Sequence, residues 1–336
     1  MQTVLYSNGK RFDEKLFKKE KDFEKLAIEN SKTLFGKNSI IIDAKKKIDS
    51  QFIGGTVPDC FLFDLSDIEN PEFYIVEVEL AKHSFYRHIF PQITKFFAFF
   101  KNTASQNDLI EKLHSIIISD NEIFKDFKSK IGSRELFLYI KEMVENSQNI
   151  LLILDEEKEE LPEIINTYTD TWGKMVKVSI LKQYVNNGES ILSLSPSFEN
   201  IEMVDITTKD SDEEETNSNY DENFHLSNVL PSTYKLYQNF KELITQKIEN
   251  VKFNPQRYYI SLRKRKNFAF LKIRRKKIAV VAMMDEQKVR NKIKSHDVVS
   301  LSESVQKFYN KPCARIDIFK NQNLEEVVDL LKEIQQ

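Results

Sequence analysis

The chain has 336 residues, of which 40% are hydrophobic and 30% are charged, which excludes a fibrous or an intrinsically disordered protein. Its length suits two globular domains better than one. Fifty basic residues nearly balance fifty-two acidic ones, so the net charge of -2 favours no particular partner.

The sequence carries no sign of export. Cys60 and Cys313 lie far apart in apolar runs, which argues against a disulfide scaffold or a cysteine-based zinc site and favours a reducing cytoplasm. Residues 1–11 lack the apolar segment and cleavage site of a signal peptide, and no run of about 18 apolar residues occurs. We therefore expect a cytoplasmic protein without a membrane span.

The first part of the chain predicts a helix followed by a strand. Apolar residues recur at helical spacing from Phe12 to Leu34, and Gly36 predicts the end of the helix because glycine is common just past a helix C-terminus. The β-branched run over residues 39–43 predicts a strand. The run Lys45 to Lys47 after it predicts a basic turn or hairpin.

Two strands with acidic residues come next, one within residues 54–64 and one over residues 73–80. In the second, alternation places Glu77 and Glu79 on the same face, about 6.6 Å apart along the strand. Converging carboxylates on a strand are costly when they are buried, unless another group offsets their charge. A divalent cation is one such group, and a partly exposed face with solvated carboxylates is the alternative.

The rest of the N-terminal part predicts a mixed sheet flanked by helices, an α/β architecture. The expected elements are a helix over 85–100 with Ser84 as N-cap, three helical segments between 105 and 148, a strand over 149–155, a helix over 161–172 and a strand over 176–181. The strand over 149–155 is continuously apolar, which is typical of a strand that is buried on both faces and parallel to its neighbours.

An acidic, polar segment over residues 199–225 predicts a flexible linker between a domain of residues 1–198 and a domain of residues 226–336. The second domain predicts a small α+β fold. Its expected elements are helices over 234–251, 286–293 and 324–334, and strands over 258–262, 268–273, 278–283 and 314–319.

Positive charge gathers in the two turns between the first three of these strands. The residues expected to bind nucleic-acid phosphates are Arg263, Arg265, Lys266, Arg274, Arg275 and Lys276. The alternatives are a solvated charged face and a surface that docks against the acidic segment over residues 212–215.

The order of elements, together with Pro58-Asp59, Glu77-Val78-Glu79 and Gln92, resembles the PD-(D/E)XK nuclease superfamily. Its signature is an Asp at the start of one strand and (D/E)-x-K on the next, often with a Gln on the following helix. The resemblance covers roughly the first 185 residues and rests on a short, degenerate pattern. It implies a restriction-endonuclease-like fold with a helical insertion.

The resemblance also implies roles for individual residues. Asp59 and Glu77 would bind Mg²⁺ or Mn²⁺, which prefer hard oxygen ligands. Gln92 with Phe96 matches a Q-x-x-x-Y helix motif in which Phe replaces Tyr, and Glu24 would match an acidic residue that some members carry on the first helix.

The departure from the pattern is Glu79, which stands where the family has Lys and could act as a base or hold a second metal. Lys82, three residues on, or the run Lys45 to Lys47 could supply the missing amine. His83 and His88 flank the site and could be ligands or phosphate contacts, but we interpret them as helix-surface residues.

By this resemblance the protein would be a metal-dependent endonuclease acting in restriction, repair or defence, on DNA rather than RNA, with a homodimer expected of a double-strand cutter. The alternative is an inactive nuclease fold that binds nucleic acid or a protein through its basic C-terminal domain. Residues 258–262 and 267–269 resemble a poorly characterised domain found behind nuclease-like domains in bacteria. That domain carries the label "predicted transport protein", for which this sequence offers no support.

Overall fold

The computed structural model describes residues 3–47, 56–168, 171–172, 174–201, 220–227, 229–309 and 311–335. The chain divides into two compact units, Met1–Thr207 and Thr208–Gln336. This division falls within the segment 199–225 that the sequence predicts as a linker. Residues 202–219 of that segment lie outside the described residues, so the flexibility predicted for them stays a prediction.

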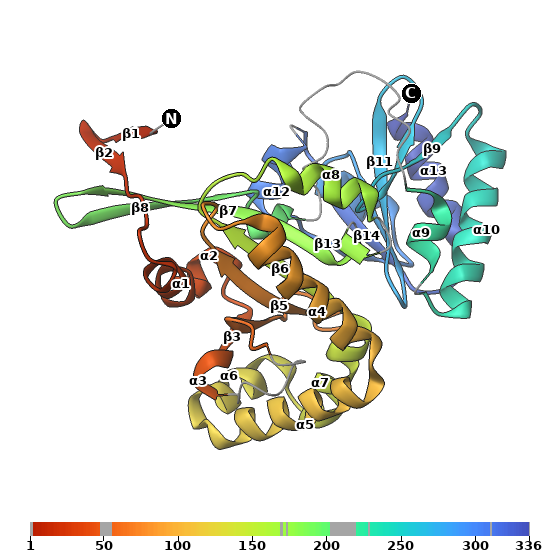
Figure 1. The fold of residues 1–336 in the computed structure, drawn as a ribbon. Helices are drawn as coiled ribbons and strands as arrows, with labels where there is room; N and C mark the ends of the chain where they lie inside the picture. The colour runs from red at the N-terminus through yellow and green to blue at the C-terminus, as the bar shows by residue number, and fades with distance from the viewer. Residues whose placement is uncertain are drawn as a thin grey trace. The chain divides into compact units, whose positions relative to one another are not determined.

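The first unit is a mixed sheet flanked by helices, which confirms the predicted fold class (Figure 1). Its strands are β1 (Val4–Ser7), β2 (Lys10–Glu14), β3 (Ser39–Asp43), β4 (Cys60–Asp64), β5 (Glu72–Glu79), β6 (Asn149–Leu154), β7 (Val176–Asn186) and β8 (Glu189–Ser195). Its described helices are α1 (Glu20–Glu29), α2 (Ser31–Phe35), α3 (Ala44–Lys47), the π-helical turn η1 (Phe85–Ile89), α4 (Phe90–Lys101), α5 (Thr103–Ser119), α6 (Asn121–Ile131), α7 (Leu136–Asn146), α8 (Glu160–Thr167) and the 3-10 turn η3 (Phe198–Asn200).

The described strands run in the order β1-β2-β7-β6-β5-β4-β3, with β8 paired to β7. Strand β6 is parallel to both β5 and β7, as its continuous apolar run predicts, whereas β3, β4 and β5 pair antiparallel. The helices α5 to α7 form the predicted insertion between α4 and β6. The carboxyl ends of β5 and β6 therefore lie at the same edge of the sheet, next to the start of β4.

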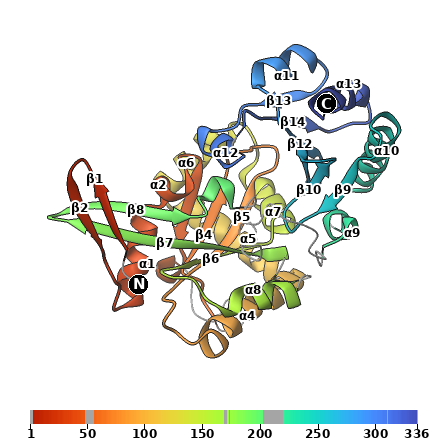
Figure 2. The same ribbon diagram turned by 90° about the horizontal axis from the view of Figure 1, so that it is seen from above.

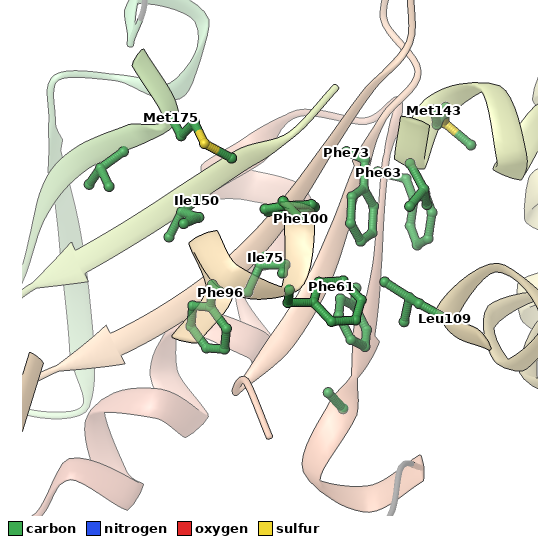
Figure 3. Close-up of a cluster of buried hydrophobic side chains, with 14 of the residues drawn as sticks. Phe61, Phe63, Phe73, Ile75, Phe96, Phe100, Leu109, Met143, Ile150 and Met175 are labelled. Carbon is green, nitrogen blue, oxygen red and sulfur yellow. The ribbon is translucent and has the colours of Figure 1, made fainter. Parts of the chain in front are cut away.

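Each face of the sheet has its own apolar core. On one face, Phe61 and Ile75 pack with Phe96 and Phe100 of α4, and all four side chains are at most 2% exposed (Figure 3). Helices α5 to α8 contribute to the same core. On the other face, β5 packs against α1 and α2. Because side chains alternate along a strand, Glu77 and Glu79 lie on the same face as Ile75.

Two β-hairpins in this unit depart from the elements expected from periodicity. The predicted N-terminal helix begins at Glu20, and Phe12 instead belongs to β2, which pairs with β1 through Asn8 and Gly9. Strand β7 continues beyond residue 181 and turns back into β8 through Asn187-Gly188. Both hairpins project from the sheet (Figure 2). Each hairpin turns at an Asn-Gly pair, which is a strong hairpin signal that apolar periodicity does not detect.

Substituting Gly188 by alanine is expected to destabilise the first unit by about 1 kcal/mol, since its φ of +86° lies in the region where a Cβ is strained. The matched change Asn187→Gly places glycine at the neighbouring position, where φ is +43°, and should lower the free energy of unfolding by less than Gly188→Ala does. Trp172, the single tryptophan, is buried in this unit, so urea unfolding followed by its fluorescence measures both variants. Equal midpoints would contradict the prediction.

The second unit is an antiparallel sheet covered by helices on one face. Its strands are β9 (Lys252–Pro255), β10 (Ile260–Arg263), β11 (Asn267–Ile273), β12 (Ile278–Ala282), β13 (Asp297–Val299) and β14 (Ala314–Ile318), in the order β13-β14-β12-β11-β10-β9. Its described helices are α9 (Glu222–Leu226), α10 (Pro231–Lys247), α11 (Glu286–Lys292), α12 (Glu303–Phe308) and α13 (Leu324–Ile334). Side chains of α10, α11 and α13 form the main core with the sheet. The sequence predicted this α+β class but missed the short elements β9, β13, α12 and α9. Helix α9 corrects the predicted linker over 199–225, because residues 222–225 of that segment are helical.

Neither cysteine is in a disulfide: Cys60 and Cys313 are free and buried. In the part of the chain that the structure describes, no helix is both long and apolar enough to cross a bilayer.

Candidate functional site

Strands β4 and β5 bring Asp59 and Glu77 together at one edge of the first sheet. Cys60 pairs with Val76 in the antiparallel register, so continuing that register by one residue sets Asp59 opposite Glu77. Directly opposed side chains in such a pair have Cβ atoms about 5 Å apart. The two carboxyl groups are close enough for the charge of Asp59 to act directly on Glu77. Asp59 is 2% exposed and Glu77 is 3% exposed, so this contact is buried.

Backbone and side-chain groups leave the pair incompletely satisfied. The Val78 N–H donates to Asp59 Oδ2 at 2.6 Å, while Lys45 forms an ion pair with Asp59 Oδ1. Glu77 Oε1 is buried and has no hydrogen-bond partner among the described residues. A buried, unpartnered carboxylate oxygen is costly, and a cation would satisfy it.

The amine at this site comes from Lys45. Its Nζ contacts Asp59 and also lies 3.0 Å from Glu24 Oε2, which brings the predicted residue of the first helix into the site. Lys82 is placed elsewhere: its Nζ donates to the carbonyl oxygen of Lys18 at 2.6 Å. Of the two sources of an amine that the sequence offered, the structure brings Lys45 into contact with the carboxylates and leaves Lys82 on the surface.

Helix α3 explains why Lys45 is placed here. The segment expected to be a turn or hairpin forms one helical turn, and Ala44 N–H donates to the carbonyl oxygen of Asp59 at 3.1 Å. This bond fixes the start of α3 beside the start of β4. Lys46 and Lys47 pair instead with Asp43 and Asp120, so the three lysines diverge.

Glu79 points to a different set of partners. Its Oε2 lies 2.8 Å from His83 Nδ1, and its Oε1 lies 3.0 Å from His88 Nε2. Glu20 of α1 completes the group, with Oε2 at 3.2 Å from His83 Nδ1. Both oxygens of the Glu79 side chain, which is 2% exposed, are therefore engaged by imidazoles.

The interpretation of His83 and His88 as helix-surface residues was therefore incomplete, because both contact a buried carboxylate. The two rings also lie edge to face, 5.2 Å apart. Glu20 was missed altogether. Its position one helical turn before Glu24 was the available signal, because residues four apart share a helix face.

Burial raises the pKa of the three carboxyl groups at this edge of the sheet. Burial, reinforced by the charge of Asp59, raises the pKa of Glu77 well above its ordinary value. Burial likewise raises the pKa of Asp59, against the opposing effect of Lys45, and raises the pKa of Glu79 to about 7. Burial alone would lower the pKa of Lys45, but Asp59 and Glu24 outweigh it and raise that pKa above its ordinary value.

Gln92 lies in the first turn of α4, one helical turn beyond His88. Its Oε1 is buried and lacks a hydrogen-bond partner among the described residues. Phe96, which stands in for the tyrosine of the helix motif, is fully buried in the core. Four phenylalanines of α4 are buried in the core on this face of the sheet: Phe96, Phe97, Phe99 and Phe100.

The basic residues of the second unit lie in two separate turns. The turn before β11 carries Arg265 and Lys266, with Arg263 at the end of β10, while the turn after β11 carries Arg274, Arg275 and Lys276. These turns are at opposite ends of a seven-residue strand, roughly 20 Å apart. The carbonyl oxygen of Arg275 also accepts hydrogen bonds from Leu230 N–H and Thr233 Oγ1, at the start of α10. The six residues therefore form two clusters and not one continuous patch.

Comparison with family models gives a match within the second unit. Residues 224–333 match the family model described as "Domain of unknown function (DUF5655)", which spans α10 to α13 and less than half of the chain. A search of curated proteins returned no match, and neither did a search of solved structures.

Proposed function

We propose that the first unit hydrolyses phosphodiester bonds in nucleic acid with the help of Mg²⁺ or Mn²⁺. The single observation that carries this proposal is the contact between two buried carboxylates, Asp59 and Glu77, beside the ammonium of Lys45. The element order and the Asp and Glu spacing resemble PD-(D/E)XK nucleases, and DNA is preferred to RNA on that resemblance alone. A role in restriction, repair or defence follows from the same resemblance.

The donor set fits a hard divalent cation. Asp59 and Glu77 would bind the cation, and the buried Glu77 Oε1, which has no hydrogen-bond partner among the described residues, would gain a ligand bond. Such an ion, when bound, would neutralise charge on the phosphate and make a nearby water more acidic. Without a cation, the two carboxyl groups share a site only if one of them keeps its proton.

Lys45 supplies fixed positive charge beside the carboxylates. Its two acidic contacts, Asp59 and Glu24, hold the ammonium at the edge of the sheet, and its side chain is 43% exposed, so a substrate phosphate can approach it. An ammonium held in this way stabilises negative charge that grows on the phosphate during hydrolysis. Glu24 is thereby a positioning residue. This arrangement restores the amine that the sequence lacks at position 79.

Glu79 is not available to complete this carboxylate pair, because both of its oxygens are bound by histidines. The family pattern has an amine at this position, and here the amine reaches the site from α3. The alternative function, binding without catalysis through the second unit, would use two basic turns at opposite ends of β11.

The test is cleavage of supercoiled plasmid DNA with Mg²⁺ or Mn²⁺, with single-stranded DNA and RNA as parallel substrates. Wild-type protein is expected to cut only when the metal is present, and Asp59→Asn is expected to abolish cutting. The matched control is Glu72→Gln, at the opposite end of the same strand as Glu77. Cutting by Asp59→Asn at the wild-type rate, or no cutting of any substrate with either metal, would overturn the proposal.

A further inference from the structure

Four side chains from separate segments converge beside the proposed hydrolytic site. Glu20 comes from α1, Glu79 from the end of β5, His83 from the turn after β5, and His88 from η1. One ligand atom of each lies within 4.8 Å of the other three. Within the described residues, this is the one group of three or more His, Cys, Asp or Glu side chains with this geometry.

The spacing of the atoms suits a single ion. With ligand bonds of about 2.05 Å, a tetrahedral site has ligand atoms about 3.3 Å apart. His83 Nδ1 lies 2.8 Å from Glu79 Oε2 and 3.2 Å from Glu20 Oε2, and His88 Nε2 lies 3.0 Å from the other Glu79 oxygen, Oε1. With one ligand atom taken from each residue, all four atoms lie within 4.8 Å of one another. A bound ion would therefore require only small side-chain shifts, in which the wider pairs close toward the tetrahedral spacing.

The backbone around the histidines is fixed by its own contacts. Ala81 N–H donates to Asp155 Oδ1 at 2.6 Å, and Lys158 Nζ donates to the carbonyl oxygen of His83 at 2.6 Å. These bonds tie the turn that carries His83 to the segment after β6. The segment 85–89 is π-helical, a rare geometry that occurs most often at functional sites. Here it presents His88 toward Glu79.

The chemistry of the donors separates this group from the Asp59 and Glu77 pair. Two imidazole nitrogens with two carboxylates favour a borderline transition ion, whereas oxygen-only ligands favour Mg²⁺. We propose that Glu20, Glu79, His83 and His88 bind a divalent transition-metal ion of the Zn²⁺ or Co²⁺ type. This site goes beyond the proposed hydrolysis and does not require it, because its readout is metal binding.

Its role would also account for the acidic residue at position 79. The carboxylate of Glu79 stands where the family has an amine, and it contacts the ring nitrogens of both histidines in the proposed transition-metal site. The alternative is a metal-free cluster in which protons on the two imidazoles bridge to Glu79. In that case substitution of the histidines changes stability but not metal affinity.

The experiment uses the full chain and Co²⁺, whose visible d–d absorption reports nitrogen donors and coordination number, with calorimetric titration of Zn²⁺ for affinity and stoichiometry. Wild type is expected to bind Zn²⁺ and to give a Co²⁺ spectrum with nitrogen ligation. His83→Ala and His88→Ala should each weaken binding at least about 10-fold. The matched control is His114→Gln, a histidine of the same unit that packs on Phe137. This variant should retain the wild-type affinity and spectrum.

Each outcome decides one question. Loss of the Co²⁺ spectrum in the two histidine variants, with His114→Gln unchanged, supports the site even if the protein cuts no nucleic acid. Unchanged Zn²⁺ affinity in His83→Ala and His88→Ala would overturn it, as would no Zn²⁺ binding by wild type. Glu79→Gln keeps the hydrogen-bonding shape and removes the charge, so an unchanged affinity in that variant would also count against the site.

Discussion

Replacing Lys45 by methionine is expected to slow phosphodiester cleavage by at least about 100-fold, whereas Lys82→Met is expected to retain the wild-type rate within about twofold. Lys45 is the lysine whose ammonium contacts Asp59 and Glu24. Lys82 donates to a backbone carbonyl of residue 18 on the surface. The two lysines have the same charge and length, so the comparison isolates position.

The expected loss of cleavage rate follows from the position of the Lys45 ammonium. Removing one fixed donor from a transition-state oxyanion typically costs 10²- to 10³-fold in rate, which corresponds to about 3–4 kcal/mol. Methionine keeps most of the aliphatic stem and removes the ammonium. Lys45→Arg retains a positive charge that still reaches Asp59, so we expect it to recover part of the lost rate. Single-turnover plasmid cleavage with Mg²⁺ gives all three rates.

Loss of the fold must be separated from loss of catalysis, because Lys45→Met leaves Asp59 buried without its ammonium. Unfolding followed by Trp172 fluorescence gives the stability of each variant in the unit that contains the site. The prediction concerns protein that remains folded under the assay conditions. Equal cleavage by folded Lys45→Met and wild type, or a larger loss in Lys82→Met, would assign the amine elsewhere.

The sequence predicted the part of the site that depends on neighbouring strands. Asp59 and Glu77 come together because an antiparallel pair of adjacent strands has few possible registers, and alternation then fixes the shared face. The parallel placement of β6 followed from its continuous apolar run in the same way. Both inferences depend on periodicity within a short segment.

Contacts between distant segments could not be predicted in this way. The choice between Lys45 and Lys82 depends on how α3 leaves β3, and the bond from Ala44 N–H to the carbonyl oxygen of Asp59 holds the start of this four-residue helix beside β4. Glu20 meets His83 across more than sixty residues of chain. No spacing in the sequence encodes either contact, since the first depends on the path of α3 and the second on the packing of α1 against the sheet.

Glutamine at position 77 is expected to stabilise the protein at pH 8 by about 1–3 kcal/mol while removing its cleavage activity. Glu77 is 3% exposed, touches Asp59 and has one oxygen without a partner. A glutamine amide can still donate to Asp59 but carries no charge to bury. If Glu77 instead stabilised the fold, Glu77→Gln would lower the free energy of unfolding, because removing one partner of a favourable buried contact is destabilising.

The pH dependence of wild-type stability has a definite sign. The pKa of Glu77 is raised in the folded state, so the native protein holds a proton that the unfolded chain releases at lower pH. That contribution is fully present below the ordinary pKa of glutamate and is lost as pH rises through the raised value. Glu79, with a pKa raised from 4.5 to about 7, behaves in the same way between those two values. Wild-type stability should therefore fall from pH 5 to pH 8, and Glu77→Gln should flatten this decline.

Mg²⁺ provides the complementary measurement, because binding to Asp59 and Glu77 requires both groups to be ionised. At pH 8, Mg²⁺ at about 100 times its dissociation constant should stabilise wild type by about 2.7 kcal/mol, and it should have no such effect on Glu77→Gln. Mg²⁺ is chosen because it favours oxygen ligands over the imidazoles of His83 and His88. Glu72→Gln, at the other end of β5, should respond like wild type. If Glu77→Gln lowers stability at pH 8, or responds to Mg²⁺ as wild type does, then the Asp59 and Glu77 contact is a structural pair and does not bind the catalytic cation.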